Sequence, residues 1–218
     1  MHDILMPTFG LPVQTALMLY ACVILLAISI FVRSTVKLVP GKVQSIIELI
    51  VVALAAQSEE IIGHGAKKLV PFIISFFLFI LISNSLALIP GFLAPTENLN
   101  NTVGLSLIVF FATHVIGFRH HGFKYLKQFM GPNIALAPLM IPIEIIGHLA
   151  RPFSLSLRLW ANMMSHEQVV TVLLILMPIA YPLLAFSTIL GILVIVIQSF
   201  VFTLLTMAYL GGALEEAH

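Results

Sequence analysis

The residues able to carry chemistry gather in one stretch of an otherwise apolar chain, between residues 142 and 167. On a helix of about 100° per residue with Glu144 as the origin, most of them share one face. The members within about 40° are His148, Arg151, Arg158, Asn162 and His166, with Ser154 and Ser165 at the edge and Glu167 pointing elsewhere. Such a face must look into protein or water, so it predicts an ion or substrate path.

Arg158 is the residue of this stretch that packing alone explains least. It stands in the middle of the segment, where a guanidinium costs at least about 2.5–3.5 kcal/mol to insert into a membrane. Arginine cannot lose its proton to lower this cost, whereas a buried lysine can. The sequence therefore predicts a site that requires a fixed positive charge.

Several neighbours of Arg158 have structural explanations as well as functional ones. Arg151, next to Pro152, could extend its charge to the membrane interface. Glu144 and His148 have the i,i+4 spacing of a pair that satisfies itself on one helix. Asn162 could bond a neighbouring helix instead of an ion path. His166 and Glu167 could be packing residues, but two adjacent titratable groups at depth favour function.

Gln198 is the notable polar residue of the last apolar run. The segment 177–182 contains two prolines and predicts a turn. In an antiparallel hairpin about this turn, Gln198 falls at the level of Arg158 and Asn162. The nearby Ser199, Thr203 and Thr206 can hydrogen-bond to their own helix backbone, so their presence does not indicate a functional site.

The elements that carry these residues must lie in a bilayer. The chain of 218 residues is 60% hydrophobic and only 9% charged, against about 25% charged in soluble domains. Its net charge of +1 indicates neither a nucleic acid nor an acidic partner. A single cysteine, Cys22, excludes an internal disulfide framework.

The apolar runs predict an all-α integral membrane protein, with about five membrane-embedded helices in one polytopic domain, residues 1–218. Each spanning helix needs about 20 apolar residues. The segment 40–66 is too polar to span and predicts an interfacial amphipathic helix. The expected spans are 15–33, 69–92 and 103–118, followed by a long, tilted hairpin of 134–177 and 182–210.

The basic residues predict the orientation. None precedes the first span, and none lies between the second and third. Those between the first two spans are Arg33, Lys37, Lys42, Lys67 and Lys68, and those after the third are Arg119, Lys124 and Lys127. By the positive-inside rule the N-terminus lies outside and the C-terminus in the cytoplasm. The first apolar run has neither a basic leader nor a cleavage site, so we expect it to be a retained span.

The run from Arg151 to Glu167 closely resembles the signature of subunit a of F-type ATP synthases. The segments 98–102, 142–144 and 198–205 resemble the same family at matching intervals. The resemblance implies a non-catalytic, ion-translocating stator in a bacterial inner membrane, with two offset aqueous half-channels and no metal or cofactor. Its implied partners are the c-subunit ring, b-type peripheral-stalk subunits, the remaining synthase subunits and the lipid bilayer, with no nucleic acid.

The resemblance also implies a role for each matching residue. Arg158 faces the ring carboxylate and prevents protons from passing directly between the half-channels. The residues implied for the outer half-channel are Asn162, His166, Glu167 and Gln198, and those for the cytoplasmic side are Glu144 and Ser154, beside His148 of the polar stripe. Relatives often place a His or Glu seven residues before the glutamine, where this chain has Gly191. The acid–imidazole partner across the hairpin is therefore missing.

Two other classes compete with this interpretation. A secondary ion transporter would bury similar charges, but it usually has two related halves with broken helices, and no such repeat is visible here. A purely structural membrane subunit would explain the spans but not the polar stripe.

Overall fold

A computed structural model describes residues 12–37, 40–89, 92–122, 125, 137–176 and 181–214. Within these residues all regular structure is helical, which confirms the predicted all-α class. The helices are α1 Val13–Thr35, α2 Lys42–Ile62, α3 Ala66–Ser85, α4 Leu99–His121, α6 Ala137–Ile175 and α7 Tyr181–Leu214. Short 3₁₀ turns lie at Gly63–Gly65, Leu86–Leu88 and Pro95–Glu97. Residues 177–180 of the predicted turn 177–182, Lys124, Lys127, residues 134–136 and the two ends of the chain lie outside the described residues, and Tyr181 and Pro182 begin α7.

In the part of the chain that the structure describes, four helices are long and apolar enough to cross a membrane: α1, α3, α4 and α7. α2, which falls in the segment expected to be interfacial, is not among them. Neither is α6, although it is the longest helix at 39 residues. It carries Glu144, Arg151, Arg158 and Glu167, and these charges separate it from the apolar spans.

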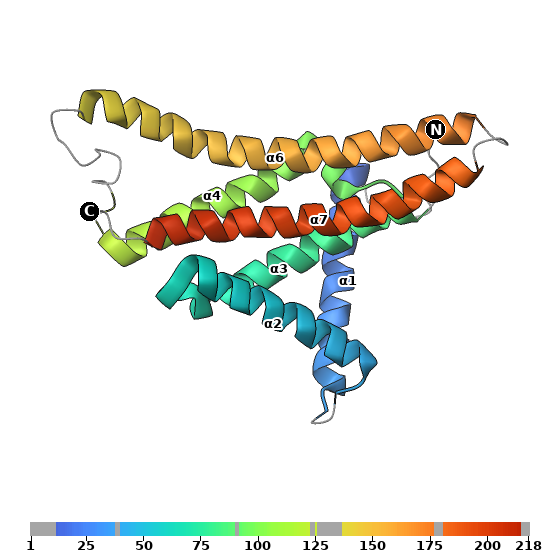
Figure 1. The fold of residues 1–218 in the computed structure, drawn as a ribbon, viewed down its shortest axis with the longest axis horizontal. Coiled ribbons are helices and arrows are strands. Elements are labelled where there is room, and N and C mark those ends of the chain that lie inside the picture. Colours follow the sequence, from blue (N-terminus) through green and yellow to red (C-terminus); the bar gives the residue numbers. More distant parts are fainter. Residues whose placement is uncertain are drawn as a thin grey trace.

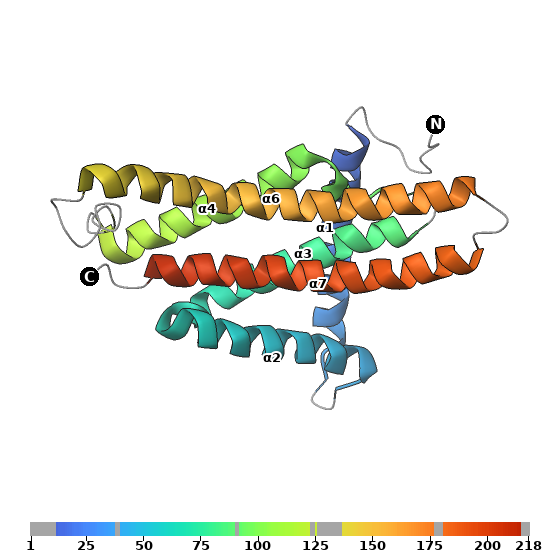
Figure 2. The same ribbon diagram turned by 45° about the horizontal axis from the view of Figure 1, so that its top comes forward.

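The last two helices form the predicted long hairpin. α6 and α7 run side by side along the longest dimension of the molecule, with α3 and α4 packed beside them and α2 beyond α7 (Figures 1 and 2). α1 runs across this direction. At about 1.5 Å per residue α6 is about 58 Å long, whereas the hydrocarbon core is about 30 Å thick. The hairpin must therefore tilt strongly if it stays within the bilayer.

α6 remains a single helix although it contains Pro142 and Pro152. Each proline removes one backbone hydrogen bond and bends a helix locally. The helix is bowed along its length and is not broken (Figure 1). The polar residues before and after Pro152 consequently share one continuous element.

Apolar clusters among the described residues hold the helices together, and a small one at Ala94, Met163 and Ile195 joins α6 to α7. Two larger clusters involve more helices. One joins α2, α3 and α7 through buried residues that include Leu54, Ile73 and Met207. The other joins α3, α4, α6 and α7, and α6 contributes Leu155 and Leu159, both almost fully buried. These two leucines fix the rotation of α6 about its axis. Arg158, immediately before Leu159, therefore points away from the bundle.

The hydroxyl residues of α7 are satisfied locally, as expected. Ser199, Thr203 and Thr206 each donate a hydrogen bond to the carbonyl four residues earlier, at 2.8–2.9 Å. All three are buried, and their small size lets α7 pack closely against its neighbours. They add no polar group to the hairpin surface.

Candidate functional site

Arg158 lies on the exposed face of α6. Among the residues that the structure describes, no carboxylate lies within ion-pairing distance of its guanidinium. Exposed apolar residues of the hairpin include Phe153 on α6 and Ile197 on α7. Ser154, one turn earlier, is also exposed on α6. A permanent charge on an apolar surface is typical of a site completed by another chain.

Asn162 and Gln198 meet across the hairpin. Nδ2 of Asn162 donates a hydrogen bond to Oε1 of Gln198 at 2.6 Å. Gln198 is only 4% exposed, and its Nε2 has no hydrogen-bond partner among the described residues. The predicted level of Gln198 relative to Asn162 is thus confirmed. Both amide hydrogens on Nε2 of Gln198 are therefore available to water or an ion path.

His166 occupies the space that Gly191 leaves open. A β-carbon added at Gly191 would collide with Nε2 of His166 and lie 2.9 Å from its Cδ2 and Cε1. Gly191 is buried, and any larger residue there would displace the imidazole. Gly191 has no side chain that could act as a partner across the hairpin. Its small size makes room for His166 of the facing helix.

A cavity of about 210 Å³ opens beside this contact. His166, Glu167 and Thr171 of α6 line it, opposite Thr188 of α7 and the segment around Ala87–Ala94. Nε2 of His166 and Oε2 of Glu167 are buried, and neither has a partner among the described residues. Buried polar atoms of native proteins are normally hydrogen-bonded, to water where protein is absent. The cavity is large enough for several waters and is polar at this end.

The wall of this cavity is held by polar residues of the 83–101 region. Thr96 donates a hydrogen bond to Oδ1 of Asn84 at 2.5 Å, and both residues are buried. Asn98 caps α4 by accepting from the backbone N–H of Asn100 at 2.9 Å, and Asn101 donates to the carbonyl of Pro95 at 2.9 Å. The asparagine-rich turn between the second and third expected spans thus has a structural role.

Glu144 and His148 form the local pair that their spacing allows. Nε2 of His148 lies 3.4 Å from Oε1 of Glu144. The His148 side chain is 6% exposed, whereas that of Glu144 is 39% exposed. The pair therefore extends from the surface of α6 into the interface with α4.

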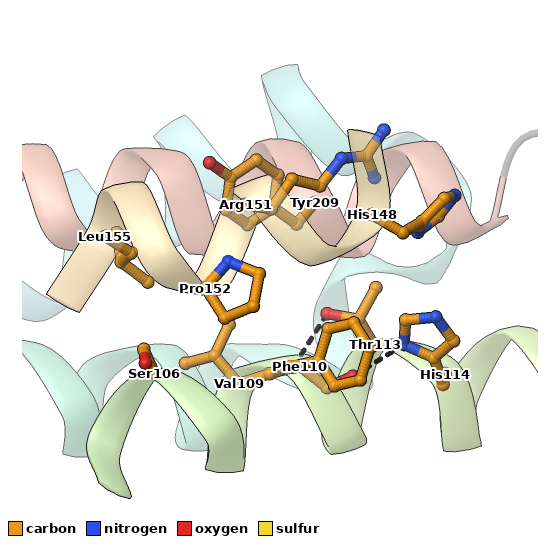
Figure 3. Close-up of a pocket in the computed structure, with 10 residues that line it drawn as sticks. All are labelled: Ser106, Val109, Phe110, Thr113, His114, His148, Arg151, Pro152, Leu155 and Tyr209. Carbon is orange, nitrogen blue, oxygen red and sulfur yellow. Dashed lines mark hydrogen bonds between the residues drawn. The ribbon is translucent and has the colours of Figure 1, made fainter. Parts of the chain in front are cut away.

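His114 of α4, which the sequence alone does not mark as a site residue, faces His148. The two ring centroids are 5.3 Å apart and the rings are inclined at 66° (Figure 3). Arg151 of α6 and Tyr209 of α7 line a small cavity together with His114 and His148. The guanidinium carbon of Arg151 lies 5.4 Å from the centroid of the Tyr209 ring. The available signal was a single histidine inside an apolar span, which by itself does not indicate a site.

The predicted polar stripe of α6 is thus divided among three surroundings. Its first part, at His148, faces α4, whereas Asn162 and His166 face α7. Arg158 and Ser154 point outward between them. The stripe spans about 80°, and α6 packs against both α4 and α7, so different members meet different helices. Among the described residues, no three His, Cys, Asp or Glu side chains are placed to hold a metal ion.

Comparison with known proteins gives one consistent family. The sequence profile described as ATP synthase A chain matches residues 15–211. The ATP synthase subunit a 1 of Syntrophotalea carbinolica is 49% identical over 195 residues, which cover 89% of this chain and 82% of that protein. The ATP synthase subunits a of Trichlorobacter lovleyi and Geobacter sulfurreducens are each 47% identical over 196 residues, or 90% of this chain and 84% and 85% of theirs.

Proposed function

The chain belongs to the ATP synthase A chain family, and we therefore propose that it is the stationary membrane subunit of a rotary ATP synthase. In this role it passes protons through two offset aqueous half-channels to and from the carboxylates of the c-subunit ring. It neither makes nor hydrolyses ATP itself. It works beside b-type peripheral-stalk subunits and the remaining subunits of the enzyme, in a bacterial inner membrane with its C-terminus in the cytoplasm.

The observation that carries this proposal is the exposed position of Arg158, which has no ion-pair partner among the described residues. A guanidinium on an apolar face at membrane depth is costly and cannot be neutralised by losing a proton. A carboxylate on a neighbouring ring would supply the missing countercharge. The exposed apolar residues of the hairpin, such as Phe153 and Ile197, suit a surface along which a hydrophobic ring slides.

The cavity at His166 and Glu167 supports an outer half-channel. It brings two titratable side chains to a space for water, and the buried atoms of both lack protein partners among the described residues. Asn162 and Gln198 lie between this cavity and the level of Arg158 along the hairpin. Their hydrogen-bonded amides provide a polar route toward the arginine.

Glu144, His148 and Ser154 support an inner half-channel on the other side of Arg158. Glu144 precedes Arg158 along α6 and Glu167 follows it, separated by on the order of 34 Å of helix. Because the hairpin is tilted, openings at these two positions are displaced along the ring as well as across the membrane. Such a displacement is what offset half-channels require.

Elementary electrostatics then couples ion flow to rotation. A neutral carboxylic acid on the ring can face lipid, whereas an ionised one pays several kcal/mol. Arg158 gives the ionised form one favourable position. Each charge that crosses the membrane potential releases about 2.3 kcal/mol per 100 mV, and this free energy drives the ring past the arginine in one direction.

Substitution of Arg158 in the whole enzyme tests the proposal. In inverted membrane vesicles we expect Arg158→Ala to abolish ATP-driven proton pumping, measured by quenching of a pH-sensitive dye. Arg158→Lys should also fail, since a lysine at depth can lose its charge. Arg119→Ala, which removes an exposed arginine at the end of α4, is the matched control and should pump normally. Normal pumping by Arg158→Ala would overturn the proposed mechanism, as would failure of the chain to co-purify with a c ring.

A further inference from the structure

A second cluster of titratable side chains lies between α4 and α6, apart from the outer cavity. His114 and His148 face each other there, with 5.3 Å between their ring centroids. The cavity they border has a volume of about 10 Å³, which is about the space of one water molecule. Pro152 and Leu155 of α6 also line it (Figure 3).

One hydrogen bond fixes the state of His114. Its Nδ1 lies 2.8 Å from the carbonyl oxygen of Phe110. A carbonyl oxygen only accepts hydrogen bonds, so Nδ1 carries a hydrogen and donates it. In the neutral ring the other nitrogen, Nε2, is then the basic one and can accept a proton. The fold thus prepares His114 as a proton acceptor.

His148 connects this buried space to the surface. Its Nε2 contacts the carboxylate of Glu144 at 3.4 Å, and that carboxylate is partly exposed. A proton taken up by Glu144 can therefore reach an imidazole that is itself almost fully buried. From His148 the remaining step to His114 is spanned by one water-sized space.

The charged and titratable groups around the pair limit how many protons it holds. These groups are Glu144 and Arg151 on α6 and Tyr209 on α7. Tyr125 lies beside His114, with 6.0 Å between the two ring centroids. Two protonated imidazoles beside the Arg151 guanidinium would place three positive charges around one small cavity, opposed by one carboxylate. Like charges this close repel one another, so these surroundings oppose a second proton on the pair.

We propose that His114 and His148 are a shared proton-holding pair of the inner half-channel, filled through Glu144 and emptied toward the ring. The inference rests on the proposed function and adds His114 as a relay residue. One proton enters at the Glu144 carboxylate, passes to an imidazole, and leaves toward the ring. No bond other than those to this proton is made or broken.

The test measures ATP-driven pumping by the whole enzyme in inverted vesicles, whose outer medium replaces the cytoplasm, between pH 6 and pH 9. Glutamine at either histidine keeps a polar side chain of similar size but cannot titrate in this range. We expect His114→Gln and His148→Gln to pump normally at pH 6. At pH 9 the rate should be about tenfold lower than in the parent enzyme, because protons are scarce and a general acid–base relay is lost.

Three comparisons make the result decisive. The double variant should behave like either single variant, because a shared pair fails when one member is lost. His120→Gln, on the exposed face of α4, is the matched control and should leave the pH profile unchanged. An unchanged profile in the His114 and His148 variants, or a loss that is equal at every pH, would overturn the inference. If at the same time Arg158→Ala abolishes pumping, the proposed function stands without the histidine pair.

Discussion

The imidazole of His166 on α6 fills the space that a side chain at Gly191 on α7 would need. The two residues belong to facing helices, so the size of one decides the position of the other. Gly191 thus creates the room in which the imidazole of His166 lies. The imidazole at the interface between the two helices therefore comes from α6 and not from α7.

Gly191→Ala should impair pumping. The added methyl collides with the imidazole, and moving a relay group by about 1 Å can cost on the order of 10² in rate. We expect at least a tenfold lower rate of ATP-driven pumping, with the chain still assembled in the enzyme. Gly212→Ala, at a position on α7 where a β-carbon meets open space, is the control and should pump normally. Equal rates for the two variants would show that His166 can move at no cost.

An exchange of the two residues should recover function. His166→Gly opens the facing surface, and Gly191→His then returns an imidazole to the same space from α7. We expect each single variant to be strongly impaired and the double variant to pump faster than either. The measurement is the initial rate of dye quenching at matched amounts of assembled enzyme. A double variant no better than the worse single variant would contradict a shared space.

The hydrogen bond between Asn162 and Gln198 should contribute measurably to stability. A double-mutant cycle with leucine at each position, followed by unfolding in mixed detergent micelles, measures their coupling. Interhelical bonds of this kind contribute about 0.6–1.7 kcal/mol in membranes. Each single variant leaves one buried amide without its partner, so we expect the double variant to be more stable than the sum of the single changes predicts. Additive changes would contradict the coupling.

Water in the cavity beside Glu167 should be detectable by cysteine labelling. In a Cys22→Ser background, Thr188→Cys places a thiol in the cavity lining, where a charged thiol reagent reaches it. Ile189→Cys, the next residue of α7, is the matched control. Its side chain is 66% exposed and outside the cavity lining, so lipid covers it and thiolate formation is unfavourable. Equal labelling of both positions would contradict a separate aqueous cavity.

The sequence alone predicted the helical class, the hairpin and the approach of Gln198 to Asn162. The helical class follows from hydropathy, and the hairpin follows from the prolines of the turn. The approach of the two amides follows because Asn162 and Gln198 are about equally far from that turn along the chain. It did not predict how the polar stripe divides between α4 and α7, because that depends on where Leu155 and Leu159 fix the rotation of α6. It also missed His114, since a histidine in an apolar span gives no signal until its partner from another helix is known.

The placement of Gln198 beside Asn162 also has a consequence for biosynthesis. α6 leaves the ribosome before α7, and by length and composition it is not a helix that can enter lipid on its own. At the centre of an inserting segment an arginine or an acidic residue costs about 2.5–3.5 kcal/mol, and α6 carries both. We therefore expect stable insertion of α6 to need α7, whose Gln198 pairs with Asn162.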